Sequence, residues 1–324
     1  MKKRMNLLKE EWERLKKAKS FILACHVRPD GDTLGSALAL AHILRQYGKD
    51  AVVIAVDGVP DNYSFIPESD TVVTNTDRRD FDIGILVDSE GIKRVGDAAE
   101  VILSAKEAAC FDHHIPENNF GDIRVIDQEA SSTAEVIMEF IEANDIQIDD
   151  IAATQLLTGL VADTGAFRFA NTSTRTFQIA STLTSLGAEP SIIAREVYDS
   201  RPLHAMKLLG RALESLETDE SGRVVWAKIS RQDLDDLGAT DADTDSIVNS
   251  VAAVKGPKVS ILFRESSPNM IRVSLRSRDG VDVNKIARVF GGGGHAAAAG
   301  CTVEAPLNDA AKIVVDEVLK WMVS

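Results

Sequence analysis

The stretch FILACHVRPDGDTLGS, residues 21–36, decides how the rest of the chain is interpreted. A short apolar run ends abruptly at His26, and Asp30 and Asp32 follow before a helix-like pattern begins. A run of this kind predicts a buried strand, which places the polar residues at its carboxyl end. Charged groups crowded at one strand end repel each other unless something offsets them. Other strands that end in the same way would bring further polar groups to the same edge of a sheet.

Strand-like and helix-like segments alternate along the first part of the chain. Apolar runs predict strands at 21–27, 51–58, 81–89, 108–114 and 124–128. Longer patterns with helix start and stop signals predict helices at 33–48, 131–144, 148–166 and 173–188. Buried strands that alternate with helices indicate a mainly parallel sheet with helices on both faces. We therefore expect an α/β domain over residues 1–188.

The pattern changes after residue 188. Residues 189–220 predict a helical linker with one polar face, and its first part, 189–203, is expected to allow the two domains to close. Strands joined by short turns are predicted at 223–230, 258–266 and 269–278, with a hairpin at SSPN between the last two. Helices are predicted at 282–290 and 308–323. Residues 221–324 should therefore form a smaller α+β domain.

Composition excludes several classes of protein. The net charge of −14 disfavours a protein that tracks a long nucleic acid, because such proteins need a strongly basic surface. No apolar run reaches 18 residues, and the N-terminus has the pattern of a charged amphipathic helix rather than of a signal peptide. Three cysteines give no disulfide framework. We therefore expect a cytoplasmic protein with no membrane partner.

Four separate segments of the α/β domain end in acidic or histidine side chains. These residues are His26, Asp30 and Asp32 after the first strand, Asp88 in GILVDS, Asp112, His113 and His114 in ACFDHH, and Asp163 before the helix break at Gly165. In an open parallel sheet, ligands bind outside the carboxyl ends of the strands. The sequence therefore predicts that these groups converge at one edge of the sheet.

Such a cluster is typical of a metal centre. Several carboxylates and imidazoles in one cleft are unstable as bare charges, and divalent cations offset that repulsion. This donor set suits Mn²⁺, with Mg²⁺, Co²⁺ or Zn²⁺ as alternatives, and it is large enough for two ions. Two ions about 3.5–4 Å apart are the usual device for hydrolysing phosphate esters. In isolation each motif has a simpler explanation, as a turn, a helix cap or a buried polar residue. His42 and His204 lie on helical patterns elsewhere and are interpreted as surface or packing residues.

A glycine-rich stretch, GGGGHAAAAG at 291–300, has two explanations. It lacks the features of a P-loop or of a dinucleotide fingerprint, but consecutive glycines allow backbone N–H groups to approach a phosphate closely. We favour a phosphate or nucleotide site that includes His295 over a tightly packed link between helix and strand. Arg276 and Arg278 share one strand face and are expected to add guanidinium contacts. Arg264 either joins them or is solvated.

These motifs resemble the DHH superfamily of phosphoesterases over nearly the whole chain. HVRPDGDTLGS, LVDS, the literal DHH and ADTG look like its four motifs in order, and GGGGHAAAAG looks like the glycine–histidine motif of the DHH-associated C-terminal domain. Within the superfamily, DHHIPENNFGD, ASSTAE and DTGAFRFANTS are most similar to the NrnA-like group of nanoRNases and pAp phosphatases. Members of that group degrade very short RNA and remove the 3′-phosphate of 3′-phosphoadenosine 5′-phosphate.

The resemblance implies a role for each matched residue. It places one metal ion among His26, Asp30 and Asp88. It places the second among Asp32, Asp88, His113 and Asp163, with Asp88 as the bridge. It also implies that His114 contacts the scissile phosphate and that Asp112 orients a histidine. In the C-terminal domain it implies that the substrate is bound by Arg276, Ser277, Asn284, Gly293, Gly294 and His295.

The sequence thus predicts a phosphoesterase with two Mn²⁺ ions, for which Mg²⁺ or Co²⁺ are alternatives. Its expected substrates are short oligoribonucleotides and 3′-phosphoadenosine 5′-phosphate, held across a cleft between the domains. One alternative is hydrolysis of linear or cyclic dinucleotides such as pApA, and another is a nucleotide sensor without catalysis. We expect no long nucleic-acid partner. A homodimer through the apolar helices of the first domain is compatible with the pattern.

Overall fold

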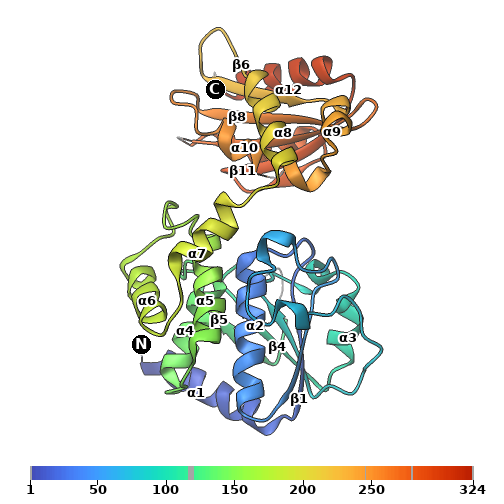
Figure 1. The fold of residues 1–324 in the computed structure, drawn as a ribbon. Coiled ribbons are helices and arrows are strands. Elements are labelled where there is room, and N and C mark those ends of the chain that lie inside the picture. Colours follow the sequence, from blue (N-terminus) through green and yellow to red (C-terminus); the bar gives the residue numbers. More distant parts are fainter. Residues whose placement is uncertain (1, 116–119, 245, 279, 323–324) are drawn as a thin grey trace. The chain divides into compact units, whose positions relative to one another are not determined.

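The computed structural model describes residues 2–115, 120–244, 246–278 and 280–322. The chain divides into two compact units, Met1–Ser200 and Arg201–Ser324 (Figure 1). The division falls between two helical stretches of the segment expected as a linker. Helix α7 (Pro190–Ala194) and the π-turn η4 (Arg195–Asp199) belong to the first unit, and α8 (Leu203–Glu214) belongs to the second.

The first unit is built on a five-stranded sheet in which every strand is parallel to its neighbour. The strands are β1 (Ser20–Ala24), β2 (Asp50–Ile54), β3 (Ile83–Val87), β4 (Glu107–Asp112) and β5 (Ile123–Ile126). Their order across the sheet is β2-β1-β3-β4-β5. The predicted parallel α/β arrangement is confirmed.

Helices cover both faces of this sheet, because alternate residues of each strand are buried on opposite sides. Phe21 and Leu23 of β1 pack in one apolar core, and Ile22 and Ala24 pack in another. The first core is formed with α1 (Lys2–Lys17), α2 (Gly31–Gln46), α4 (Thr133–Ala143), α5 (Asp150–Asp163) and α6 (Thr174–Ser185). The second is formed with α3 (Ala98–Ser104) and the turn η3 (Ile92–Val95) (Figure 1). Two further turns, η1 (Asp61–Tyr63) and η2 (Ser69–Thr71), follow β2.

The strand order fixes where a ligand can bind. From the central pair β1 and β3, the chain passes outward in opposite directions, to β2 on one side and to β4 on the other. The connections then lie on opposite faces, and in open α/β sheets ligands bind at the carboxyl ends of two strands related in this way. The segments that begin with His26 and Asp88 start at this point.

The second unit contains a mixed sheet with helices on both faces. Its strands are β6 (Glu217–Thr218), β7 (Val224–Ile229), β8 (Val259–Ser267), β9 (Met270–Ser277), β10 (Gly293–Gly294) and β11 (Ala298–Glu304). Their order is β10-β11-β9-β8-β7-β6, and only β7 and β8 are parallel among these described strands. Helices α11 (Val283–Val289) and α12 (Leu307–Trp321) pack on one face. Helices α8, α9 (Arg231–Leu237) and α10 (Ile247–Val251), with the turn η5 (Asp241–Thr244), lie on the other.

Two details of the second unit differ from the prediction. Strands β7 and β8 are not joined by a short turn: two short helices separate them, and a parallel pair requires such a crossover. These helices have only seven and five residues, so neither shows a full apolar period. The alanine run was not expected as a strand, yet β11 pairs with β9 along its whole length, because tertiary pairing overrides the low β-propensity of alanine. The hairpin of β8 and β9, with Asn269 in the left-handed region at φ 61°, is confirmed.

No helix in the described ranges has both the length and the apolar character that a membrane crossing requires.

Candidate metal centre

The first ligand-type side chains are positioned by the loop after β1 and by the first turn of α2. Asp30 caps this helix: its Oδ1 accepts the backbone N–H of Asp32 at 3.0 Å and that of Thr33 at 3.1 Å. Gly31 allows the helix to start close to α5, since a Cβ atom there would lie 2.7 Å from the Cβ of Ala162. Asp32, one residue further, is completely buried.

Asp88 lies directly after β3 in a backbone conformation that residues other than glycine rarely adopt. Its φ is 56°, in the left-handed region, and its side chain is 4% exposed. Its backbone N–H donates to the carbonyl of Phe111 on β4 at 2.9 Å, so the neighbouring strand holds this strained turn. Strain of this kind is maintained only where the surrounding structure imposes it, and it concentrates at functional sites.

The structure brings together all six residues expected to bind metal. Their ligand atoms form overlapping groups in which every atom lies within 4.8 Å of the others. The groups are His26, Asp30 and Asp88; Asp32, His113 and Asp163; and Asp88, His113 and His114. Asp88 and His113 each belong to two of them, so the groups form one continuous cluster.

Hydrogen bonds orient two of the imidazoles toward the carboxylates. His26 Nδ1 lies 3.0 Å from the carbonyl of Val27, and His113 Nδ1 lies 3.3 Å from the carbonyl of Ala130. A ring nitrogen can approach a carbonyl in this way only as an N–H donor, so Nε2 of each neutral ring keeps its lone pair. His26 Nε2 lies 3.6 Å from both Asp30 Oδ2 and Asp88 Oδ2. An imidazole whose lone pair faces carboxylates is oriented as a metal-binding histidine is.

His113 gives the strongest sign that a cation belongs here. Its Nε2 lies 3.4 Å from Asp163 Oδ2 and 3.6 Å from Asp88 Oδ1. The atom is buried and makes no hydrogen bond with any described residue. Buried polar atoms are normally satisfied, and an exception usually marks an ion or a catalytic role. The donor set of carboxylate oxygens and imidazole nitrogens therefore fits a divalent cation.

The protonation of the cluster shows how unfavourable its bare charges are. Burial, followed by the negative charges of Asp88 and Asp163, raises the pKa of Asp32 well above its usual value. Burial and then Asp88 and Asp30 raise the pKa of Asp163 to about 8. Burial alone would lower the pKa of His26, but the carboxylates of Asp30 and Asp88 raise it to about 10. Without a metal, protons must therefore supply the missing positive charge.

Asp112 and His114 form a hydrogen-bonded pair, and through His114 this pair is part of the cluster. Asp112 is fully buried, and its Oδ1 accepts the backbone N–H groups of His113 and His114 and, at 2.9 Å, Nδ1 of His114. Burial acts to lower the pKa of His114, yet the hydrogen bond that it donates to Asp112 and the charge of Asp88 raise it to about 9. Asp112 thus fixes the ring of His114 and favours its protonated form.

One residue that contacts two of the carboxylates was not predicted from the sequence. Thr133, at the start of α4, donates its backbone N–H to Asp32 Oδ2 at 2.6 Å and its hydroxyl to Asp88 Oδ1 at 2.9 Å. The next N–H, of Ala134, donates to Asp32 Oδ1 at 3.0 Å. The first N–H groups of a helix lack partners within it and favour negative charge. The signal was present in ASSTAE, whose serine and threonine mark a helix start, but nothing in that motif indicates which carboxylates it meets.

The glycine-rich stretch of the second unit lies beside the other predicted substrate residues. The carbonyl of Ala297 accepts the N–H of Ser277, that of Ala296 accepts the N–H of Val283, and Ala298 is the register partner of Arg276. His295 is exposed, and the side-chain oxygen of Asn284 is buried without a described partner. Arg276, Ser277, Asn284 and residues 293–295 therefore form one neighbourhood.

Close packing explains some of the glycines in this stretch. A Cβ atom at Gly292 would lie 2.2 Å from the carbonyl oxygen of Gly300, and one at Gly294 would lie 2.5 Å from that of Ala298. Close packing therefore requires these two glycines. A Cβ at Gly293 would meet nothing within 4 Å, so packing does not explain this exposed glycine.

The arginines of this region are not equivalent. Arg276 donates Nε to the side-chain oxygen of Asn249 at 3.2 Å, and Arg278 lies one residue beyond the end of β9. Of the two alternatives for Arg264, a solvated side chain is wrong, because the residue is only 6% exposed. Its guanidinium donates to the carbonyl of Asp241 at 2.9 Å and to the hydroxyl of Thr244 at 2.8 Å. It holds the turn η5 on the face of the sheet that α8, α9 and α10 cover.

His42 and His204 lie outside the cluster, as interpreted. His42 is a packing residue, since it is buried on α2 between Glu68, at 2.7 Å, and Asp149, at 2.9 Å. His204 is at the start of α8, and its Nε2 lies 3.2 Å from Asp243 Oδ1. Both are paired with carboxylates that stabilise local structure.

Two family models match the chain in sequence order. Residues 20–162 match the DHH family, N-terminal domain, and residues 221–323 match the DHHA1 domain. The first match contains the strands and loops that carry the cluster up to the residue before Asp163, and the second contains the mixed sheet.

Curated relatives extend this likeness over most of the chain. A Streptococcus mutans protein named probable bifunctional oligoribonuclease and PAP phosphatase NrnA is 31% identical, over 91% of this chain and 93% of the relative. The bifunctional oligoribonuclease and PAP phosphatase NrnA of Thermus thermophilus is also 31% identical, over 87% of this chain and 83% of its own. The cyclic-di-AMP phosphodiesterase PdeA of Listeria monocytogenes is 28% identical over 83% of this chain, but over only 42% of that relative.

A solved structure has the same fold. An exopolyphosphatase-related protein from Bacteroides fragilis matches with a TM-score of 0.91 and 25% identity, covering 99% of this chain and 97% of its own. The likeness therefore includes both units.

Proposed function

The chain belongs to the DHH family and also carries a DHHA1 domain, and from this premise we propose that it is a two-metal phosphoesterase. Its proposed reactions are hydrolysis of short RNA oligonucleotides to mononucleotides and removal of the 3′-phosphate of 3′-phosphoadenosine 5′-phosphate. The relatives named NrnA support these substrates. The observation that carries the proposal is the cluster around Asp88 and His113, whose overlapping groups offer ligands for more than one ion.

The geometry suggests which residues would hold each ion. His26, Asp30 and Asp88 would hold one, and Asp32, Asp88, His113 and Asp163 would hold the other, with Asp88 between them. Mn²⁺ is the proposed metal because it accepts both carboxylate oxygen and imidazole nitrogen; Mg²⁺ and Co²⁺ are alternatives. When bound, the ions supply the positive charge that lowers the pKa of an attacking water and offsets charge on the phosphate.

The protein's own residues complete the proposed mechanism. His114 is held by Asp112 in a geometry that leaves its Nε2 away from this hydrogen bond. The hydrogen bond from His114 Nδ1 to Asp112 favours the protonated ring, which can donate Nε2–H to a phosphate oxygen as negative charge develops there. Asp112 acts through His114 and is a positioning residue. Arg276, Ser277, Asn284, Gly293, Gly294 and His295 are proposed to bind the nucleotide.

A side-by-side assay tests the proposal. The purified protein is incubated with Mn²⁺ and, separately, with a 5′-labelled short RNA, 3′-phosphoadenosine 5′-phosphate and pApA. We expect mononucleotides from the RNA and phosphate from the second substrate. The variant D88A should abolish both reactions, while D70A, which removes an exposed acid far along the chain from the cluster motifs, should not. Near-normal turnover by D88A would contradict the two-metal site.

The same assay separates a second candidate function. The relative named cyclic-di-AMP phosphodiesterase favours dinucleotide hydrolysis, which would use the same cluster. Activity on pApA alone would move the proposed substrate to that class. A nucleotide sensor would bind without releasing any product, so the absence of products from all three substrates in Mn²⁺ would favour it.

A further inference from the structure

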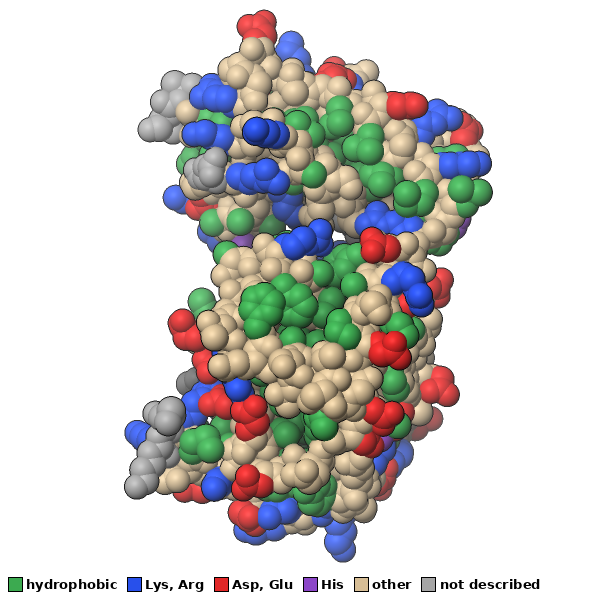
Figure 2. Space-filling view, turned by 60° about the vertical axis from the view of Figure 1, so that its left-hand side comes forward, with side chains coloured by type: hydrophobic (Ala, Val, Ile, Leu, Met, Phe, Trp, Pro, Cys, Tyr) green, Lys and Arg blue, Asp and Glu red, His purple; other side chains and the backbone are tan. Residues whose placement is uncertain are grey.

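The two units differ strongly in charge. Residues 1–200 contain 20 Lys and Arg against 33 Asp and Glu, whereas residues 201–324 contain 16 against 17. Figure 2 shows Lys and Arg side chains gathered on the surface of the second unit. In a chain of net charge −14, this unit is therefore where an anionic ligand meets the least repulsion.

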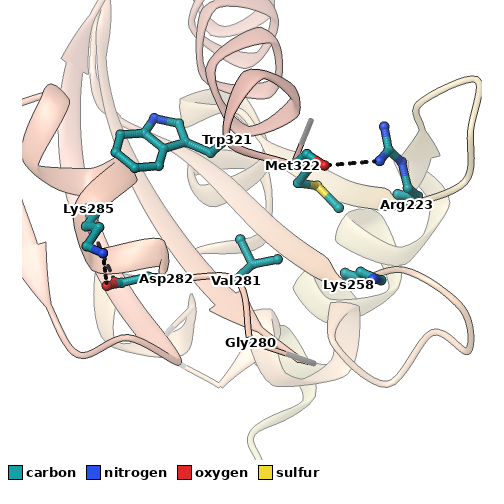
Figure 3. A pocket seen from close by; sticks show the side chains of 8 residues that line it. All are labelled: Arg223, Lys258, Gly280, Val281, Asp282, Lys285, Trp321 and Met322. Carbon is teal, nitrogen blue, oxygen red and sulfur yellow. Dashed lines mark hydrogen bonds and ion pairs between the residues drawn. The ribbon is translucent and has the colours of Figure 1, made fainter. Parts of the chain in front are cut away.

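A cavity of about 290 Å³ opens in the second unit, and its lining residues differ from those proposed above to bind substrate (Figure 3). Three cationic side chains line it, and each comes from a different segment. Arg223 directly precedes β7, Lys258 directly precedes β8, and Lys285 lies on α11. None of the residues 276, 284 or 293–295 lines the cavity. It is therefore a separate feature of this sheet end.

The positive charge of the cavity is only partly offset. The one acidic lining residue, Asp282, lies 3.5 Å from Lys285 Nζ. Arg223 donates to the backbone carbonyl of Met322 at 3.5 Å and to the hydroxyl of Ser221 at 2.9 Å, neither of which carries charge (Figure 3). Among the described residues, no side chain pairs with the ammonium of Lys258. Like charges gathered in this way are relieved by a bound anion.

Apolar and aromatic side chains also line the cavity. Val281, Met322 and the indole of Trp321 line it, and Trp321 is 41% exposed at the end of α12. The indole Nε1–H donates to Glu317 at 2.9 Å, which fixes the plane of the ring. Aromatic side chains of this kind stack on nucleobases, and they do so with little regard to sequence.

We propose that this cavity binds a nucleoside monophosphate, with the phosphate at Arg223 and Lys258 and the base against Trp321. A ligand with an anionic end and a flat apolar end can contact both the cationic and the apolar lining residues. The volume of the cavity is at the lower end of the range for small-ligand sites. The site is independent of the metal centre and of the nucleotide residues proposed above. It does not require that the proposed function be correct.

Intrinsic fluorescence of the full chain tests the proposal. Trp321 is one of three tryptophans, so the signal of wild type minus that of W321F reports on this site. The titration uses AMP in EDTA, which prevents metal-dependent turnover. We expect saturable quenching in wild type and none in W321F. Inorganic phosphate should compete with AMP, and raising KCl from about 50 to 300 mM should weaken binding, because screening reduces attraction between exposed charges.

Matched variants identify the site. K258Q and R223Q should each weaken AMP binding by about 10-fold, the usual loss for one charge-assisted phosphate contact. K312Q removes an exposed lysine of α12 outside the cavity and should bind like wild type. D88N and R276Q should also keep the Trp321 signal, which separates this proposal from the proposed function. Circular dichroism checks that each variant is folded.

Four results would each overturn the proposal. Quenching that persists unchanged in both K258Q and R223Q would do so, and so would quenching by adenosine as strong as that by AMP. A response that disappears in R276Q would assign the nucleotide to the region around residues 276 and 293–295 instead. Absence of any response to AMP up to about 10 mM, where even a ligand of millimolar affinity saturates, would also overturn it.

Discussion

Asp88 and Thr133 show how single residues create the metal centre. Asp88 adopts a left-handed backbone conformation after β3, which few residues other than glycine adopt without strain. Thr133 donates its hydroxyl to Asp88 and its backbone N–H to Asp32, so one buried side chain and its own amide contact both carboxylates. The strain at Asp88 is thus compensated by hydrogen bonds from another segment of the chain.

We predict that T133V weakens metal binding while T133S retains it. Valine has nearly the same shape as threonine but cannot donate to Asp88, whereas serine can. Loss of such an outer contact typically reduces metal affinity about 10–100-fold. Mn²⁺ titration by calorimetry measures this directly, without activity as the readout. Equal affinities of T133V and T133S would show that the hydroxyl does not position Asp88.

At the scale of elements, the contact between α2 and α5 brings the cluster together. Asp30 and Asp32 begin α2, and Asp163 ends α5, so the two helices must pack closely and in register. Gly35 allows this approach: a Cβ atom there would lie 2.3 Å from the carbonyl oxygen of Gln155. His42, bonded to the α5 cap Asp149, ties the other ends of the same helices.

We predict opposite effects for two glycine-to-alanine substitutions in helices. G35A should destabilise the protein by about 3 kcal/mol or more, since the backbone of α5 cannot move away without loss of packing. G210A, in α8, should stabilise it by about 0.5–1 kcal/mol, because alanine favours the helix and its Cβ meets nothing within 4 Å. Urea unfolding of both variants measures this. A neutral G35A would mean that the two helices separate easily.

At the scale of the whole molecule, metal binding and stability are linked through protons. In the metal-free protein, the pKa values of Asp163, His114 and His26 are raised to about 8, 9 and 10. The unfolded values are about 3.9 for aspartate and 6.5 for histidine, so the folded state holds protons that the unfolded state releases. The stability that these groups contribute is greatest at low pH and is lost as the pH rises through the folded values.

We therefore predict that Mn²⁺ stabilises the protein more at about pH 8.5 than at about pH 6.5, because metal and protons compete for the same ligands. The Tm in EDTA should be lower at about pH 8.5 than at about pH 6.5. The increase in Tm caused by Mn²⁺ should be larger at the higher pH. In D88N the rise should be small at both. A metal effect that is equal at the two pH values in wild type would contradict the linkage.

Net charge also gives a prediction about substrate length. Each added phosphate of a long RNA meets a molecule of net charge −14, so attraction at the site is opposed by repulsion outside it. We expect kcat/KM to fall from a dinucleotide to an RNA of about 24 nucleotides, and added salt to restore part of the loss by screening. Activity that rises with RNA length at low salt would contradict this expectation.

The sequence by itself determined the fold class of the first unit and which residues could meet at its edge. Polar residues that directly follow apolar runs lie at strand ends, and parallel strands share one edge, so His26, Asp88 and His113 could be placed together without coordinates. Helix starts at Ser132 and Ser173 were equally readable, because capping is a local interaction.

Only the tertiary structure decided contacts between segments that carry no periodic signal. The hydroxyl of Thr133 meets Asp88 across 45 positions of the chain, and Arg264 is buried because Asp241 and Thr244 satisfy it. Likewise, β11 is a strand because β9 offers a partner, and Arg223, Lys258 and Lys285 share a cavity because the sheet aligns the ends of their segments. Local propensity determines where an element begins and ends, but long-range packing determines what each polar side chain meets.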